Sequence, residues 1–386
     1  MPGGVQTNAK APGIWGGEPP PGFASRASGG RVWDLDGNEW IDFPMALGSV
    51  LLGHAEPAVT EAIRRQLCDG ISFTLMHPLE VTVAERIAAM CPGVDTVRFT
   101  KSGSEATTAA VRLARARTGR DKLVVCGYHG WHDWCAGAQG PQPGVPEIVG
   151  RLAVPVPYGD LAVLERLLAA QDVAAVVVDP IATGRPSVNF LHGVVDLCKR
   201  AGTVSIFDEV IAGFRIALGG AREKYGVMPD VSCYGKALGN GMPIAAVAGS
   251  RAIMGEYLRT AVSGTYAGET LSLAAANVVL DHLEGGTVLT AIAGLGADLK
   301  RGLADVVARY GLTARISVRG EDCRPTVIFS EERDKAIFQR SMVERRILFN
   351  GTFNLCARHT EADITAAVDA VERASRILAG QEISDG

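Results

Sequence analysis

The stretch Thr203-Val204-Ser205-Ile206-Phe207-Asp208 is a mainly apolar run that ends in an acid. Such a run without alternation is typical of a strand buried on both faces of a parallel sheet. Similar strands are predicted over 94–100, 122–126 and 174–179, and helices over 56–68, 79–90, 104–117, 161–170 and 194–200. This alternation predicts right-handed crossovers and an α/β fold with a mainly parallel central sheet flanked by helices.

Before and after this α/β region, predicted helices and strands no longer alternate regularly. Residues 31–43 alternate around Asp36-Gly37, which predicts a hairpin. Beyond 280 we expect helices over 289–310 (interrupted near Gly294 and Gly296), 335–345 and 361–378, with strands over 314–318 and 326–329. We therefore predict an arm and hairpin over 1–45 that joins the small domain, a large domain over 46–280, and a small α+β domain over 281–386.

Bulk properties exclude several classes of protein. The chain has 386 residues, a net charge of −4 and no basic tract, which argues against nucleic acid as a partner. Its eight cysteines contain no CxxC pair, so we expect free thiols in a reducing cytosol. No leader opens the sequence, and no apolar run of about 18 residues is long enough to span a membrane. A cytoplasmic location is therefore expected.

A lysine lies among small residues in the stretch Gly235-Lys236-Ala237-Leu238-Gly239-Asn240-Gly241. A lysine amine forms a Schiff base with an aldehyde, and a strand-end acid keeps a pyridine nitrogen protonated. Asp208 lies at the carboxyl end of a predicted strand, where such sheets bind ligands. Lys236 and Asp208 together predict a pyridoxal site. Taken singly, Lys236 also fits an exposed glycine loop, and Asp208 also fits an ion pair with Arg215.

Two hydroxyl-rich loops are candidate phosphate sites. Ser102, Gly103 and Ser104 lie between a predicted strand and helix, where free amides and the helix dipole attract an anion. An ordinary helix cap is the alternative. The loop 263–270, which contains Thr265, is a second and weaker candidate.

Two further stretches offer contacts to a planar ring. The loop 126–134 contains Tyr128 and two tryptophans, which can stack on a ring or pack against a second domain. Its cysteine and histidines lack a recognised zinc spacing, so no metal is predicted. Val210 points to the same side of an extended chain as Asp208, and it either presses on the ring or belongs to the core.

In this order, the motifs resemble the class III aminotransferases of the fold type I pyridoxal-phosphate superfamily over nearly the whole chain. The most specific pieces are Ser102-Gly103-Ser104-Glu105-Ala106, Tyr128-His129-Gly130, Phe207-Asp208-Glu209-Val210 and Gly235-Lys236-Ala237-Leu238-Gly239. The stretch 207–215 is most similar to the glutamate-1-semialdehyde aminomutase branch, because ornithine-type members usually carry glutamine where Ile211 stands.

The resemblance implies pyridoxal 5'-phosphate (PLP) as cofactor and assigns roles to single residues. Lys236 would form the Schiff base, and Asp208 would pair with the pyridine nitrogen. Tyr128 and Val210 would flank the ring. The phosphate would be bound by Ser102, Gly103 and Ser104, and by Thr265 of a neighbouring subunit, which implies a homodimer with active sites at the interface.

The sequence departs from the aminomutase pattern in two places. The arm over 6–12 lacks the arginine that helps hold the substrate carboxylate, and the stretch 179–184 ends in Gly184 where the aminomutase pattern has an asparagine. The aromatic loop with Trp131, Asp133 and Trp134 looks more like members that act on sugar or aminoglycoside-type compounds. We therefore predict an aminotransferase for a carbohydrate-like carbonyl compound. The alternatives are an aminomutase or epimerase, and a non-catalytic scaffold.

Overall fold

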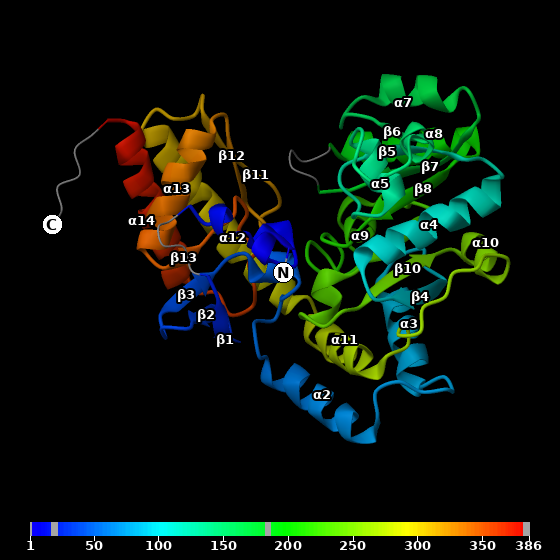
Figure 1. The fold of residues 1–386 in the computed structure, drawn as a ribbon, viewed down its shortest axis with the longest axis horizontal. Coiled ribbons are helices and arrows are strands. Elements are labelled where there is room, and N and C mark those ends of the chain that lie inside the picture. Colours follow the sequence, from blue (N-terminus) through cyan, green and yellow to red (C-terminus); the bar gives the residue numbers. More distant parts are fainter. Residues whose placement is uncertain (1, 17–21, 182–186, 381–386) are drawn as a thin grey trace. The chain divides into compact units, whose positions relative to one another are not determined.

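A computed structural model describes residues 2–16, 22–181 and 187–380. The chain divides into two compact units, one formed by residues 1–57 with 287–386 and the other by residues 58–286. In Figure 1 the second unit runs from blue through cyan and green to yellow. The sequence prediction placed the domain boundaries at 45 and 280, and the structure divides the chain at 57 and 286. The departure at Gly184 lies outside the described residues.

The described part of the larger unit contains a seven-stranded sheet in the order β4-β10-β9-β8-β7-β5-β6. The strands are β4 (Thr96–Thr100), β5 (Lys122–Cys126), β6 (Ala153–Pro155), β7 (Val173–Val178), β8 (Val204–Asp208), β9 (Val231–Tyr234) and β10 (Ala245–Gly249). Strand β10 is antiparallel to β4 and β9, whereas the pairs from β9 to β6 are parallel. This confirms the predicted mainly parallel sheet.

Helices cover both faces of this sheet (Figure 1). On one face, Ile206 and its neighbours pack against α4 (Gly103–Thr118) and α5 (Asp133–Ala138). On the other face, Phe207 packs against α7 (Leu161–Leu168) and α8 (Val188–Ala201). Each such side chain, when fully buried, stabilises the fold by about 1.5–3 kcal/mol. Burial on both faces explains why β7 and β8 are continuous apolar runs rather than alternating ones.

The remaining helices of this unit are α2 (Pro57–Asp69), α3 (Pro78–Met90), α6 (Glu147–Arg151), α9 (Ala221–Tyr225), α10 (Arg251–Met254) and α11 (Thr270–Leu283). Helix α4 begins with a capping box, in which the Ser102 hydroxyl accepts the Glu105 N–H at 3.2 Å and the Glu105 carboxylate accepts the Ser102 N–H at 3.0 Å. The helix ends at Gly119, whose φ of +67° closes the last turn.

The smaller unit contains the sheet β1-β2-β3-β13 and the pair β11-β12 among its described residues. The predicted hairpin is confirmed as β2 (Arg31–Asp34) and β3 (Glu39–Asp42), with Gly37 at a φ of +82° in the turn. The other strands are β1 (Ala24–Ser28), β11 (Ile316–Arg319), β12 (Thr326–Phe329) and β13 (Ile347–Leu348). Its main helices are α12 (Thr287–Arg309), α13 (Glu332–Glu344) and α14 (Glu361–Leu378).

The predicted interruption of the helix over 289–310 is wrong. Helix α12 runs unbroken from Thr287 to Arg309. A Cβ atom on Gly296 would lie 1.6 Å from the carbonyl oxygen of Asp322, so glycine permits close packing there and does not break the helix.

Helix hydropathy and the state of the cysteines bear on the predicted cellular location of the protein. No single helix in the described ranges is both long and apolar enough to cross a membrane, and α11 and α12 meet that criterion only when taken together. All eight cysteines lie in described residues, and each is a free thiol there.

Candidate active site

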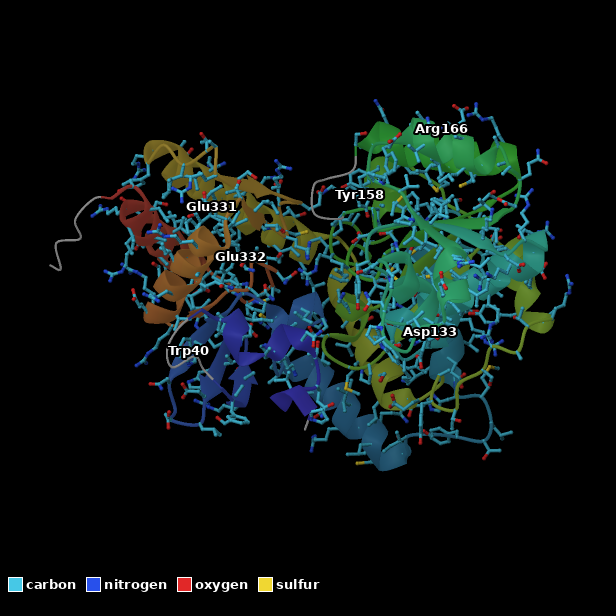
Figure 2. All side chains as sticks on the ribbon, turned by 45° about the horizontal axis from the view of Figure 1, so that its top comes forward. Trp40, Asp133, Tyr158, Arg166, Glu331 and Glu332 are labelled. Carbon is cyan, nitrogen blue, oxygen red and sulfur yellow. The ribbon has the colours of Figure 1, made fainter. Side chains whose placement is uncertain are left out.

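The carboxyl ends of four parallel strands meet at one edge of the larger sheet. In the strand registers, Cys126 pairs with Val178, Val178 with Phe207, and Asp208 with Cys233. The loops that follow β5, β7, β8 and β9 therefore leave the sheet at the same edge. Tyr158, labelled in Figure 2, joins two of them, because its hydroxyl donates to the carbonyl oxygens of Cys126 at 2.7 Å and Asp179 at 2.9 Å.

Asp208 is a buried carboxylate at this edge, with 8% of its surface exposed. Its Oδ2 lies 2.9 Å from Nδ1 of His129, and its Oδ1 accepts the Val210 N–H at 3.2 Å. A buried carboxylate without partners would cost several kcal/mol, and these contacts supply its partners. Asp208 therefore pairs with His129, and not with Arg215, the partner weighed from the sequence.

His129 is a candidate site residue to which the sequence interpretation gave no role beyond that of a possible metal ligand. Its carbonyl oxygen accepts the Thr107 hydroxyl at 2.9 Å, and its ring lies nearly parallel to that of Trp134, with centroids 6.3 Å apart. Its Nε2 is buried without a hydrogen-bond partner among the described residues. The position of His129 just after a strand was a signal, but its partner Asp208 lies 79 positions further along the chain.

The described residues contain no group of three metal-ligating side chains. Burial also raises the pKa of Cys126 to about 12, so its sulfur stays a thiol at neutral pH.

Lys236 follows β9 and opens the short 3₁₀ helix Lys236–Gly239. Its φ of +43° lies in the left-handed region, which costs a residue other than glycine about 1–2 kcal/mol. Strained backbone of this kind is concentrated at functional sites, where the surrounding fold holds it in place. The side chain is half-buried, at the same sheet edge as Asp208.

The loops after β5 and β8 pack closely against the start of α4 at this edge. A Cβ atom on Gly103 would lie 2.9 Å from the two methyl carbons of Val210, and one on Gly130 would lie 2.2 Å from Oγ of Ser104. Only glycines therefore let the loops after β8 and β5 approach the helix start so closely. The first amide groups of this 16-residue helix lack intrahelical partners, and its dipole favours an anion there.

The other predicted cofactor contacts, Tyr128, Ser102 and Thr265, are less clearly placed for binding. Tyr128 lies at the edge with 64% of its surface exposed, and the Ser102 hydroxyl is engaged in the helix cap. Thr265 lies in a loop that lines a pocket with Thr100, Lys101 and Glu105, and Lys236 does not line that pocket. The contact of Thr265 with a neighbouring subunit's cofactor thus stays a prediction.

These observations fit PLP. The edge offers a lysine amine, a buried carboxylate in contact with a histidine, and a helix start whose first amides suit a phosphate. The buried, unpartnered Nε2 of His129 is a further polar atom that the described protein residues do not satisfy. The site thus defines a fold type I pyridoxal-phosphate enzyme.

Comparison with known proteins assigns the family. Residues 16–342 match the family model described as "Aminotransferase class-III". The chain belongs to this family, whose members are PLP-dependent enzymes. The hypothesis of a non-catalytic scaffold is therefore set aside.

Relatives and solved structures agree with this assignment. The glutamate-1-semialdehyde 2,1-aminomutase of Desulforamulus reducens is 36% identical over 98% of this chain and 95% of its own length. That of Aquifex aeolicus is 37% identical over 86% and 82%. The FumI protein of Sphingopyxis sp. MTA144 superposes with a TM-score of 0.89 at 28% identity, over 98% of this chain and 93% of that one. An omega-transaminase from Sphaerobacter thermophilus gives 0.86 at 27%, over 92% and 90%.

Proposed function

We propose that this chain moves an amino group within one small substrate, as an aminomutase does, with Lys236 as the catalytic amine. The observation that supports this best is the 36% identity to an aminomutase across 98% of the chain. The sequence prediction favoured a carbohydrate-like substrate and gave the aminomutase as an alternative. The two aminomutase relatives favour the alternative.

The residues at the sheet edge suit this chemistry. When bound, PLP supplies an electron sink for negative charge at the amine-bearing carbon of the substrate. Asp208 would hold a proton at the pyridine nitrogen, and His129 would hold Asp208 in place through the 2.9 Å contact. The amides of Gly103 and Ser104 would bind the phosphate.

Lys236 would serve both as anchor and as proton carrier. Its Nζ would attach the cofactor, then accept the proton lost by the amine-bearing carbon and return it when the new amine-bearing carbon forms. Tyr128 and Val210 would flank the ring and keep water from it. No external amino donor enters this scheme, because the same nitrogen leaves one carbon and returns at its neighbour.

The proposal is tested by incubating the purified holoenzyme with glutamate 1-semialdehyde, without any added amine. We expect the isomeric amino acid to accumulate, as measured by chromatography, and the Lys236→Ala variant to produce none. Product that forms only after glutamate or another amine is added would contradict the proposal and identify an aminotransferase.

One observation favours the second candidate, an aminotransferase for a carbohydrate-like carbonyl compound. Trp131 follows Tyr128 by three residues, and 74% of its surface is exposed. Asp133, labelled in Figure 2, follows Trp131 by two residues. An exposed indole and an acid suit the apolar face and the amines of an amino sugar. For this candidate, Trp131→Ala raises KM for the sugar in an assay with an amino donor and leaves kcat within about twofold.

We further propose a cytoplasmic homodimer with active sites at its interface and no nucleic-acid partner. Thr265 supports the dimer, because the pocket that it lines with Thr100 and Lys101 does not include Lys236. Light scattering of the purified protein tests it, and a monomer that turns over substrate would contradict it.

A further inference from the structure

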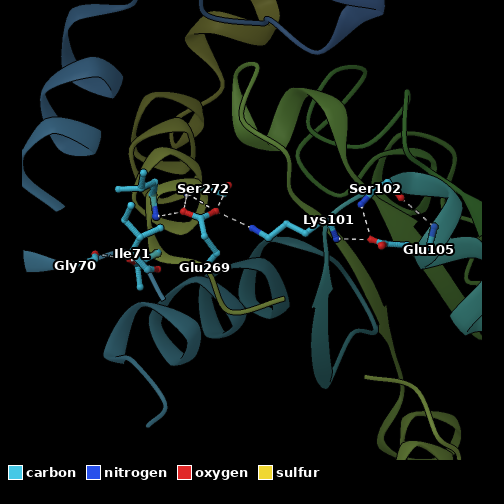
Figure 3. A network of polar contacts seen from close by, with 9 residues as sticks. Gly70, Ile71, Lys101, Ser102, Glu105, Glu269 and Ser272 are labelled. Carbon is cyan, nitrogen blue, oxygen red and sulfur yellow. Dashed lines mark hydrogen bonds and ion pairs between the residues drawn. The ribbon is translucent and has the colours of Figure 1, made fainter. Parts of the chain in front are cut away.

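An ion pair links two loops of the larger unit that lie far apart in the sequence (Figure 3). The Nζ atom of Lys101 lies 2.9 Å from Oε2 of Glu269. Both side chains are largely buried, with 20% and 12% of their surfaces exposed. Lys101 directly precedes the cap of α4, and Glu269 is the cap of α11.

Each partner is also anchored within its own loop. The Lys101 N–H donates to Oε2 of Glu105 at 2.7 Å, so the backbone of Lys101 is tied to the first turn of α4. Glu269 accepts the Leu271 N–H at 2.6 Å and the Ser272 hydroxyl at 2.6 Å, which ties it to the first turn of α11. The ion pair therefore joins two rigid helix starts and not two mobile side chains.

Glu269 remains charged in this arrangement. Burial raises its pKa, but the hydrogen bonds from Ser272 and Lys101 outweigh burial and leave the pKa below its ordinary value. A largely buried pair is costly to break on one side, because the remaining charge loses its partner.

The two loops are the ones that carry the candidate phosphate contacts. Gly103 and Ser104 follow Lys101 by two and three residues, and Thr265 precedes Glu269 by four. Both loops also line one pocket, in which Thr100, Lys101 and Glu105 face the stretch Ser263–Ala267.

We propose that the Lys101–Glu269 ion pair is a positioning device for the phosphate end of the cofactor. It fixes the start of α4 relative to the 263–269 loop, so that the affinity for PLP depends on both charges together. The inference rests on the phosphate role proposed above for Gly103 and Ser104. Neither Lys101 nor Glu269 is a catalytic residue in this scheme.

A double-mutant cycle tests this inference on the full-length chain. Lys101→Met, Glu269→Gln and the double variant are freed of cofactor and titrated with PLP, and the dissociation constant is measured by absorbance. We expect each single variant to bind PLP about tenfold more weakly, and the double variant to bind no more weakly than the worse single one. Amide hydrogen exchange over 263–272 should accelerate in both single variants.

Lys122→Met is the matched control. Lys122 forms an ion pair with Asp172 at the opposite edge of the same sheet, so its loss should leave the affinity for PLP unchanged.

Three outcomes would overturn the inference. Unchanged dissociation constants with a lowered melting temperature would show that the ion pair has a structural role alone. Weakening by Lys101→Met but not by Glu269→Gln would show that Lys101 binds the phosphate directly. Independent, additive effects would show that the two charges are not coupled. None of these results depends on whether the enzyme isomerises or transaminates, so the proposed function can fail separately.

Discussion

The two buried histidines, His129 in the larger unit and His359 in the smaller one, have opposite surroundings. His129 contacts the carboxylate of Asp208 at the carboxyl edge of the sheet. His359 packs against Phe43, with ring centroids 4.7 Å apart, and its Nδ1 accepts the Cys356 N–H at 3.1 Å. Burial alone therefore does not mark a functional histidine. The carboxylate contact at a strand end makes His129 a candidate site residue, whereas His359 contacts a phenyl ring and a backbone amide.

The largest loss of activity is expected when Lys236, the proposed catalytic amine near His129 and Asp208, is replaced. Lys236→Ala should lower kcat by about a thousandfold or more, because it removes both the covalent anchor and the proton carrier. The absorbance of the lysine-bound cofactor should disappear with it. Lys122→Ala, at the opposite sheet edge, is the control. Full activity of Lys236→Ala would refute the proposed role.

Removing the partner of His129 is the next largest test. Asp208→Asn should lower kcat by about a hundredfold, because an amide cannot hold the charge on a pyridine nitrogen as a carboxylate does. Asp230→Asn is a matched control, since Asp230 also contacts β8 through the Ser205 N–H at 2.8 Å but lies at its other end. Equal losses in both variants would mean that the site residue acts only through stability.

The comparison predicts a smaller, graded effect for His129 itself. His129→Leu should lower kcat by about tenfold, because Asp208 loses one charge-assisted hydrogen bond. His129→Asn keeps a donor near the Nδ1 position and should recover part of the activity. If Leu and Asn lower kcat equally while the cofactor stays bound, the contact with Asp208 has no part in catalysis.

His359 should affect stability and its pH dependence, with kcat at pH 7 within about twofold of the parent in His359→Gln. Burial lowers the pKa of His359 to about 4, against the opposing effects of Asp363 and Asp42. In the unfolded chain His359 takes up a proton near pH 6.5, whereas in the folded chain it stays neutral until the pH approaches 4. Stability is therefore full above pH 6.5 and falls by about 3 kcal/mol as the pH drops to 4.

Urea unfolding at pH 7 and pH 4.5 measures this loss. His359→Gln should remove that part of the pH dependence while leaving the other titrating groups in place. An identical pH dependence in parent and variant would show that His359 is accessible to protons in the folded state.

Much of the fold was predictable because burial leaves a direct mark on the sequence. The strand β5 and the helix α14 were predicted with the bounds that the structure shows, since one is apolar after its first residue and the other is strongly periodic. Strands β9 and β10 were missed. They flank a stretch rich in glycine, and their small residues such as Ala245 carry little strand propensity.

The candidate site was only partly predictable for a related reason. Glycines at 103 and 235 signalled a close backbone approach, but not that Val210 is the neighbour that requires it at Gly103. Glu209 is a similar case. It looks like a second acid beside Asp208, yet burial raises its pKa to about 8, and its carboxyl accepts the Ala221 N–H at 2.9 Å.

The sequence by itself determined the family and the mainly parallel sheet and predicted Lys236 as the catalytic lysine, because these depend on local patterns and on motifs in order along the chain. Only the tertiary structure decided that His129 is the partner of Asp208 and that Lys101 is paired with Glu269, 168 positions away. Such pairs form where strand ends and helix starts meet in space. A linear pattern carries no information about which loops the sheet order brings together.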